Sequence, residues 1–550
     1  MENMIATKFS KLITLSTLFT SFSFMAFAQQ GQAPITANSL VVLLFTCVMV
    51  LVVFLAAILG DKIIKLVAAK LNPDLDGANV GLVASLKEMI LGSSKLSNDS
   101  KKKVITLSKG FDIKLKGKAK KVIANYSSAT YAIKPTDFRG LKPIPKMIVK
   151  EGSKVKAGDK LFYDKGFEGV FFTAPVSGEV LEIKRVAKRA ISEIIIKSDG
   201  KFESVKFKTG NPSTLSKKEI IANLTESGAW TLFLERPFGV VASLHHTPKA
   251  IYISASDTAP LAVNYGFVLN QLDKADFQAG IDALNKLSNH VHLNLDTAAA
   301  KSSFSEGLQN VQVNYFQGQH PAGNVGVQIH HIDGISKGDV VWTIKAEDVV
   351  TIGKLFTQGI YEPTKYVAVA GFVLKNTKYI KAMQGFNIAD LLANNLTDEH
   401  VRVISGNVLS GTKIEKDGFL GFYDNNISVI EEGDQQEMFG WLVPQYARPS
   451  LSPTFPWKNM ELASFEANSN MHGEKRAFVV TGQYEEVLPM DLYPQHLIKA
   501  IIKNDFEEIE GLGIYELLEE DLALAEFSCT SKQPLQHILR EGLDYIRSQS

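Results

Sequence analysis

The sequence has only two cysteines in 550 residues, Cys47 and Cys529, and almost no net charge. Two thiols cannot form a disulfide framework, and they are too few to hold an iron–sulfur cluster, which is usually ligated by four thiolates. Lys and Arg number 59 against 58 Asp and Glu, so the formal net charge is +1. No global charge therefore draws the chain toward nucleic acid, and any partner must be recognised through local features.

The sequence also lacks the glycine motifs that hold nucleotides. No G-x-x-x-x-G-K-[ST] loop occurs, and no G-x-G-x-x-G follows a predicted strand. The first motif cradles phosphates beside a lysine, and the second places a dinucleotide at a helix N-terminus. The sequence therefore gives no support for binding of a nucleoside triphosphate or a dinucleotide by this chain.

Apolar runs without charge are concentrated at the N-terminus. Residues 1–28 have Lys8 and Lys11 before an apolar run and end in "AFA", which is the pattern of a signal peptide. Residues 39–59 contain about 20 residues without a charge, enough to cross the roughly 30 Å hydrocarbon core of a bilayer. We expect a transmembrane helix over 39–59.

The charges that follow this run predict the location of the rest of the chain. Lys62, Lys65 and Lys70 come directly after it, and lysines beside a membrane helix favour the cytoplasmic side. Residues 60–104 are predicted to form a juxtamembrane linker, since they end in small polar residues and three lysines. The sequence therefore predicts a single-pass protein of the inner (cell) membrane with its main body in the cytoplasm.

A turn pattern predicts the fold of residues 105–205. The segment "VKEGSKVKAGDKLF" has the spacing V-x-E-G-x-x-V-x-x-G-x-x-L, and A-P-x-x-G-x-V follows at Ala174. Turn residues between short β-branched runs are typical of tight hairpins. The pattern resembles the barrel-sandwich fold of biotinyl and lipoyl domains. Lys165 lies in a turn without the sequence context of a modified lysine, so we expect no carrier function.

The remaining chain changes its pattern three times, which predicts an α+β multidomain protein. Residues 206–380 alternate strands with helices, as in "AIYISASDT" and "ADFQAGIDALNKLS", and this indicates an α/β layer architecture. Residues 381–470 hold short β-rich segments such as "RVISGNVLSG". Residues 471–550 have apolar positions at i, i+3 and i+4, which predicts a helical C-terminal domain.

The histidines of the α/β region lack the partners of a metal site. His290 and His292 fall on one face of a predicted strand, but no third ligand lies at a recognisable spacing. The stretch "HPAGNVGVQIHHID", residues 320–333, lacks the spacing and the lysine of a phosphate loop. His330 and His331 would face different directions in either a helix or a strand. We therefore predict no metal site and interpret the stretch as a turn and packing element.

Longer motifs carry a resemblance to one protein family. They are "RPFGVV", "HPAGNVGVQIHHID", "VVWTIKAEDVVTIGKLF", "RVISGNVLSG", "EEGDQQEMFGWLVP" and "LEEDLALAEFSC". Over about residues 105–550 the chain resembles the NqrA family of the Na+-translocating NADH:quinone reductases. The resemblance implies a barrel-sandwich domain, a Rossmann-like domain related to the flavin subunit of respiratory complex I, a β-grasp domain and a helical C-terminus. The family has no membrane span, so the N-terminal extension is a departure that would act as a tether.

The resemblance also implies an activity and partners. Such reductases oxidise NADH, reduce quinone and export sodium, and their NqrA subunits lie in the cytoplasm beside membrane and flavin-bearing subunits. It implies that this chain binds no cofactor, that NADH and quinone are substrates of the complex, and that no residue of this chain is catalytic. Whether the quinone is ubiquinone or menaquinone stays open. The candidates for contact with quinone or a neighbouring subunit are Arg236, Phe238, His320, His331 and Trp441.

One alternative predicts a different topology. A periplasmic adaptor (membrane fusion protein) of an efflux system also joins an N-terminal anchor to a barrel-sandwich domain. In such adaptors a long α-helical hairpin separates the two half-motifs, whereas here only a few residues lie between "VKEGSKVKAGDKLF" and "FTAPVSGEV". The structure of this short segment therefore distinguishes the two interpretations.

Overall fold

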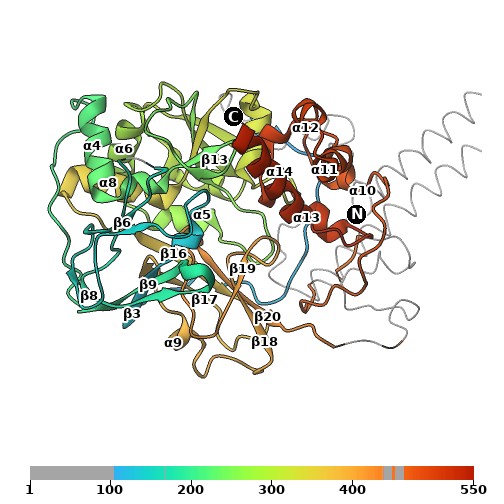
Figure 1. Cartoon of the computed structure of the whole chain (residues 1–550), viewed down its shortest axis with the longest axis horizontal. Helices are drawn as coiled ribbons and strands as arrows, with labels where there is room; N and C mark the ends of the chain where they lie inside the picture. Colours follow the sequence, from blue (N-terminus) through green and yellow to red (C-terminus); the bar gives the residue numbers. More distant parts are fainter. Residues whose placement is uncertain (1–103, 168, 436–437, 439–448, 452–463, 550) are drawn as a thin grey trace, which may run out of the picture. The chain divides into compact units, whose positions relative to one another are not determined.

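Four β-sheets organise the part of the chain that the structure describes (Figure 1). This structure is a computed structural model, and it describes residues 104–167, 169–435, 438, 449–451 and 464–549. The predicted signal-like segment 1–28 and transmembrane helix 39–59 lie outside these residues, as do residues 60–103 of the predicted linker. Within the described ranges, no helix combines the length and the apolar character that crossing a bilayer requires.

The N-terminal region folds into two small antiparallel sheets, as the turn pattern predicted. One has the order β3 (Thr130–Ile133), β9 (Ile191–Ser198), β8 (Gly178–Arg185) and β5 (Lys154–Val155). The other has the order β4 (Lys146–Met147), β6 (Lys160–Tyr163) and β7 (Phe171–Thr173).

Two turns of this region have the conformation that their glycines suit. Gly152 and Gly158 have φ angles of +80° and +90°, in the left-handed region that favours glycine. The described residues between the two half-motifs hold β6, turns and β7, and none of them is helical. The helical hairpin of an efflux adaptor is therefore not formed between the half-motifs.

A seven-stranded sheet forms the centre of the α/β region. Its order is β1 (Val104–Thr106), β14 (Gln312–Gln317), β13 (Val291–Asp296), β12 (Ile251–Ala255), β15 (Val341–Lys345), β10 (Leu234–Arg236) and β11 (Val240–Val241). In this order, neighbouring strands from β1 through β14, β13 and β12 to β15 are parallel. β10 is antiparallel to β15, and β11 is antiparallel to β10. β12 and β13 are buried along almost all of their length because parallel strands of this kind are covered on both faces, although His292 and Asn294 make β13 partly polar.

Each face of this sheet packs into a different hydrophobic core. Ile251 and Ile253 of β12 belong to one core together with helices α6 (Lys274–Leu284) and α8 (Ala346–Gln358). Tyr252, which points the opposite way because side chains alternate along a strand, belongs to the second core. Helix α7 (Val325–Asp333) also contributes to this second core, so the stretch that could be helix or strand is a helix.

Helices α6 and α8 approach each other closely because each has a glycine at the contact. A methyl group at Gly353 would overlap the carbonyl oxygen of Asp276, and one at Gly280 would overlap the carbonyl oxygen of Val349. Helix α6 begins after Asp273, whose carboxylate accepts hydrogen bonds of 2.9 Å from two free amides of the first turn. The close helix pair covers the α/β sheet as one layer.

A mixed six-stranded sheet follows. Its order is β19 (Thr412–Ile414), β18 (Val401–Ser405), β20 (Asn426–Glu431), β16 (Thr364–Ala370), β17 (Lys378–Met383) and β2 (Ile123–Asn125). β2 comes from the N-terminal region and runs parallel to β17 at the edge of the sheet. The two N-terminal strands β1 and β2 thus belong to two different sheets, and neither belongs to the barrel-sandwich sheets that follow them in sequence.

The described C-terminal residues are helical, as their periodicity predicted. The helices are α10 (Gln483–Val487), α11 (Pro494–Lys503), α12 (Phe506–Gly511), α13 (Glu519–Ser528) and α14 (Leu535–Gln549). Figure 1 shows them together in red beside the α/β region. Their apolar faces build the second core, to which Leu497, Ile501, Leu539 and Leu543 contribute.

Candidate functional site

A cavity of about 430 Å³ lies at the carboxyl ends of β12 and β15. Ser254, Ser256 and Asp257 line it at the end of β12, and Thr343 and Lys345 line it at the end of β15. Open α/β sheets bind their ligands outside the carboxyl ends of their parallel strands. The cavity is therefore the natural candidate for a binding site.

Loops of the six-stranded sheet and the start of α13 close the cavity. The lining residues of these segments fall within 405–412, where Val408 is the exception, and within 421–426 and 518–520. The hydroxyl of Ser405 donates to Asp424 at 2.6 Å and accepts from the amide of Gly421 at 2.8 Å. These bonds hold the two loops together, so this wall is preformed.

Two lining carboxyl groups have unusual titration properties. Burial raises the pKa of Asp137 to about 6, although its Oδ2 accepts a 2.7 Å hydrogen bond from the amide of Phe422. Burial also raises the pKa of Asp257 to about 6, partly offset by the charge of Lys345. Lys345 itself is fixed by hydrogen bonds from Nζ to the carbonyl of Tyr423 and to Asn425. Both carboxyl groups therefore exchange protons close to neutral pH.

The charged side chains that line the cavity are mostly acidic. The acidic ones are Asp137, Asp257, Asp348, Asp424, Glu519 and Glu520, and the basic ones are Arg139, Arg236 and Lys345. Both arginines are bound to carboxylates of α13. This environment repels a phosphate group, because an anion would meet excess negative charge without a free arginine to pair with it.

His320 places in the wall a ring nitrogen that lacks a partner in the part of the chain that the structure describes. The hydroxyl of Thr258 accepts from the amide of Gly323 at 2.9 Å and lies 3.2 Å from Nδ1 of His320. The Thr258 hydroxyl can either donate to Nδ1 or accept from it, so this contact is compatible with both tautomers of the neutral ring. Nε2 is buried and has no partner among the described residues. Burial lowers the pKa of His320 to about 4, so the ring is neutral at pH 7.

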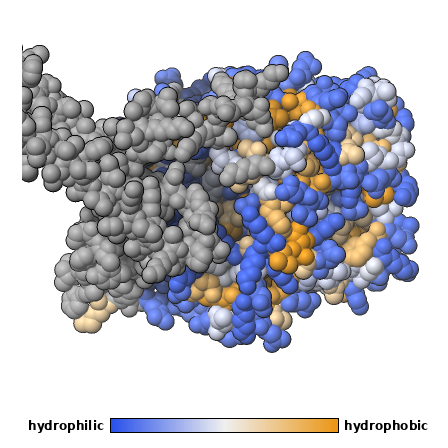
Figure 2. Space-filling view, turned by 180° about the vertical axis from the view of Figure 1, so that it is seen from behind, coloured by the Kyte–Doolittle hydropathy of each residue, from blue (hydrophilic) through white to orange (hydrophobic). Residues whose placement is uncertain are grey.

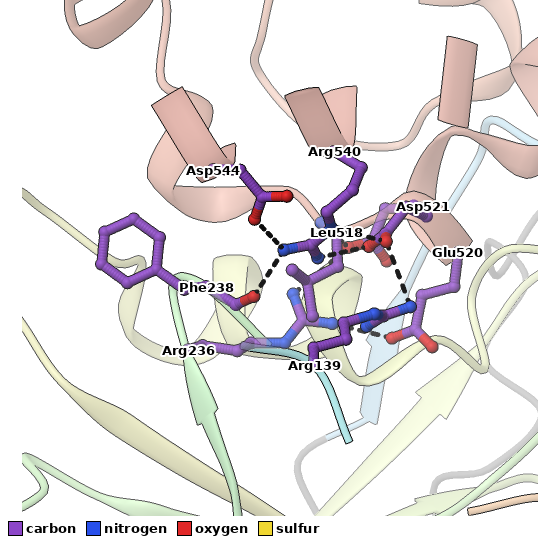
Figure 3. A network of polar contacts seen from close by, with 9 residues as sticks. Arg139, Arg236, Phe238, Leu518, Glu520, Asp521, Arg540 and Asp544 are labelled. Carbon is purple, nitrogen blue, oxygen red and sulfur yellow. Dashed lines mark hydrogen bonds and ion pairs between the residues drawn. The ribbon is translucent and has the colours of Figure 1, made fainter. Parts of the chain in front are cut away.

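The guanidinium of Arg236 is bound by two carboxylates of helix α13 (Figure 3). Its side chain is 1% exposed, and its guanidinium lies 3.2 Å from Asp521, which is fully buried, and 2.7 Å from Glu520. A buried arginine with two carboxylate partners is a fixed structural element. Arg236 thus lines the cavity with both terminal nitrogens bound to carboxylates, whereas its buried Nε has no partner among the described residues.

Phe238 takes part in the same contact region through its backbone. Its carbonyl accepts a 2.9 Å hydrogen bond from Arg540 of α14, and Arg540 also binds both carboxylate oxygens of Glu519 at 2.7 Å. Arg139 lies 3.1 Å from Glu519 on the cavity side. Figure 3 shows these groups converging between the α/β domain and the helices.

Among the described candidates, His331 does not line the cavity. His331 is on α7, and its Nε2 lies 2.7 Å from the carbonyl of Pro489. Trp441 lies outside the described residues. Another tryptophan, Trp230, is a core residue whose indole donates to the carbonyl of Ala242 at 2.7 Å. The structure thus brings Arg236 and His320 together at the cavity and places His331 at an internal helix contact.

Metal-binding geometry is also absent from what the structure describes. No three His, Cys, Asp or Glu side chains group there as ligands for an ion. His292, which the sequence offered as a possible ligand, is buried against Tyr252 with ring centroids 4.8 Å apart, and burial lowers its pKa to about 4.

Family models match three parts of the chain. The model described as "NqrA N-terminal barrel-sandwich hybrid domain" matches residues 105–199. The model described as "NqrA second alpha/beta domain" matches residues 215–361, and "NQRA C-terminal domain", an SLBB domain, matches residues 366–416. The barrel-sandwich and α/β expectations are confirmed, and the β-rich region contains an SLBB domain.

Curated relatives cover the same part of the chain. The NqrA subunit of the Na(+)-translocating NADH-quinone reductase of Haemophilus influenzae (strain PittGG) is 38% identical over 452 residues, which are 81% of this chain and 100% of the relative. The corresponding protein from Pasteurella multocida (strain Pm70) is 37% identical over 450 residues, with the same coverage. Among solved structures, a chain of an NAD+-reducing [NiFe]-hydrogenase in the air-oxidized state covers 62% of this chain and 69% of its own, at 12% identity and a TM-score of 0.35, which is too low to carry an argument. The chain belongs to the NqrA family of the Na+-translocating NADH-quinone reductases.

Proposed function

We propose that this chain works as the NqrA subunit of a sodium-exporting NADH:quinone reductase and that its cavity takes the head group of the quinone. Family membership supports the first statement. The second rests on the polarity of the cavity wall, which is acidic and lacks a free arginine. A quinone ring is neutral, so it avoids the repulsion that a flavin or nucleotide phosphate would meet.

The donors and apolar groups of the wall fit such a ring. The buried Nε2 of neutral His320 has no protein partner among the described residues, and in the tautomer that carries the proton there it would donate to a carbonyl oxygen of the ligand. Leu234, Ile344 and Phe422 contribute apolar surface. A cavity of about 430 Å³ falls within the usual range of small-molecule sites, roughly 300–1,000 Å³. These features support binding of the ring without a catalytic group from this chain.

The test compares two histidine variants in the purified complex. We expect His320→Ala to raise the KM for quinone several-fold and to leave electron transfer from NADH to a soluble acceptor unchanged, because only the ring contact is lost. His331→Ala, which changes a histidine away from the cavity, should leave the KM unchanged. A photoreactive quinone should label lining residues such as Phe422. Labelling of other subunits alone would contradict the quinone proposal.

The partners and location belong to the same proposal. We propose that membrane and flavin-bearing subunits accompany this chain and that it binds no cofactor itself. Its body would lie on the cytoplasmic side of the inner membrane, tethered through residues 39–59. Its α/β domain would be Rossmann-like and its SLBB domain a β-grasp fold. Co-purification with the flavin-bearing subunits tests the assembly, and protease protection in spheroplasts tests the location. A body accessible from the periplasm would contradict the assigned side.

A further inference from the structure

Four large apolar side chains of the barrel-sandwich domain are half exposed. Ile144 is 55% exposed, Ile148 49%, Leu181 55% and Val186 52%. On the face drawn in Figure 2, hydrophobic residues form separate patches in a mostly hydrophilic surface. We call these four residues the aliphatic patch. Exposed apolar groups of this size that lie together mark a surface that another body covers.

Backbone contacts place the two segments of the aliphatic patch side by side. The amide of Ile191 donates to the carbonyl of Pro143 at 3.1 Å, next to Ile144. The amide of Gly152 donates to the carbonyl of Val180 at 2.8 Å, next to Leu181. Both ends of the segment 143–152 therefore contact the β8–β9 hairpin, whereas β4 in its middle pairs with β6 and the amide of Ile148 donates to the carbonyl of Leu161.

The turn between β8 and β9, which carries Val186 of the aliphatic patch, is closed by hydrogen bonds. The amide of Val186 donates to the carbonyl of Ala190 at 2.8 Å, and the guanidinium of Arg185 donates to the carbonyl of Arg189 at 3.2 Å. Lys188 and Arg189 both have positive φ, 56° and 63°, so the chain reverses tightly there. Val186 is held at this turn between exposed basic residues.

Basic side chains surround the aliphatic patch. They are Lys142, Lys146, Lys150, Arg185, Lys188 and Arg189, all exposed, and none has an ion pair within the described part of the chain. The acidic side chains nearby are fewer. Glu193 pairs with Lys184 at 3.2 Å, and Glu151 accepts from the amide of Ile183 at 2.9 Å. Glu179 and Glu182 are exposed, and Asp417 lies close enough for its charge to act on Lys184. The surface is therefore positive around an apolar centre, although the whole chain is nearly neutral.

We propose that the aliphatic patch and its basic rim rest on an anionic phospholipid bilayer. Aliphatic side chains partition into the interface, and each nearby Lys or Arg adds electrostatic attraction to an anionic membrane surface. Four of the six rim residues are lysines, and lysine is depleted in the interfaces that proteins form with each other. The proposal is independent of the cavity and fits a family whose complex includes membrane subunits.

The test uses the full chain and a fluorescent probe inside the patch. Leu181→Cys is introduced with Cys47→Ser, and Cys529 is retained because it is buried and protected from labelling in the folded chain. An environment-sensitive dye at position 181 is measured after reconstitution into vesicles of phosphatidylcholine alone or of equal parts phosphatidylcholine and phosphatidylglycerol. The N-terminal apolar run is the same in both samples, so a difference between them reports the patch.

We expect a blue shift of the dye and protection from aqueous iodide in anionic vesicles only, and high salt should reverse both effects. The variant Arg185→Glu, Lys188→Glu, Arg189→Glu should lose them. The matched variant Lys217→Glu, Lys218→Glu, Lys286→Glu makes the same change of charge outside the patch and should keep them. Equal emission in neutral and anionic vesicles would overturn the proposal. So would a dye that becomes protected only when other subunits are added, which would assign the patch to a protein interface.

Discussion

Lys365 and Asp348 form an ion pair that is almost completely shielded from water. The Nζ of Lys365 lies 2.6 Å from Oδ1 of Asp348, and the side chains are 1% and 2% exposed. Lys365 belongs to β16 of the six-stranded sheet, and Asp348 lies in the first turn of α8, where the helix dipole favours a carboxylate. The pair thus joins the six-stranded sheet to a helix that covers the seven-stranded sheet.

Removal of one member of this ion pair should lower the free energy of unfolding much more than removal of both members. Lys365→Met leaves the Asp348 carboxylate buried without a partner, and we expect the free energy of unfolding to fall by about 3–5 kcal/mol. The double variant Lys365→Met, Asp348→Leu should recover most of this loss, because no charge stays buried. Urea denaturation measures both. Equal losses in the single and double variants would contradict the explanation.

The contact between Arg236 and Asp521 should control the attachment of the C-terminal helices. Arg236→Met leaves the buried carboxylate of Asp521 unpaired, so we expect faster hydrogen exchange in α13 and α14 than in the parent protein. Arg236→Lys keeps the charge but lacks the second donor arm that reaches Glu520, and should give an intermediate effect. If exchange in α13 is the same in both variants and the parent, Arg236 does not hold these helices.

The raised pKa of Asp137 predicts a dependence of stability on pH. Its pKa is about 6 in the folded protein against 3.8 for the ordinary side chain, because burial disfavours the charged form. Between these values the folded state keeps a proton that the unfolded chain releases, so the free energy of unfolding falls as pH rises. Asp137→Asn should match the parent near pH 4 and exceed it in stability above pH 6. Denaturation at several pH values checks this, and a constant difference at all pH values would contradict it.

The crossing of α6 and α8 should not tolerate a methyl group. Gly353→Ala places Cβ against the backbone of Asp276, so the helices must separate, and overpacking of this kind costs about 1–3 kcal/mol or more. Gly511→Ala is the control, since no atom lies within 4 Å of the added methyl group. Thermal unfolding should show a clear loss for the first variant and none for the second. A Gly353→Ala protein as stable as the parent would show that the helices have room to adjust.

Local periodicity was sufficient to predict some of the regular elements. The strand β12 and the helix α14 have the apolar spacing that burial imposes on a strand and on a one-sided helix, so the sequence alone locates them. The stretch 325–333 was ambiguous. It is a helix because Val327 and Ile329 pack in one core with the C-terminal helices. The local sequence cannot predict these contacts, because their partners lie far away along the chain. β1 and β2 were not predicted, since three-residue strands depend on distant partners.

The cavity was predictable only in part. His320 and Arg236 stood out because they lie in long motifs, and the structure places both in the wall. Asp137 and Tyr423 were missed, because they reach the cavity from segments almost 300 residues apart in sequence. The sequence did contain a signal for Asp257 and Lys345. Asp257 follows the buried strand β12, and Lys345 is the last residue of the buried strand β15. Ligands commonly bind at these carboxyl ends of parallel strands.

The position of β1 also has a consequence for the growing chain on the ribosome. Its partner β14 is made about 200 residues later, so at about 5–20 residues per second the first strand waits on the order of ten to forty seconds for its neighbour. β2 waits longer still, because β17 is synthesised after β14. The barrel-sandwich strands, which pair among themselves, can close during this interval. The segment that emerges before them is therefore among the last to be incorporated into a sheet.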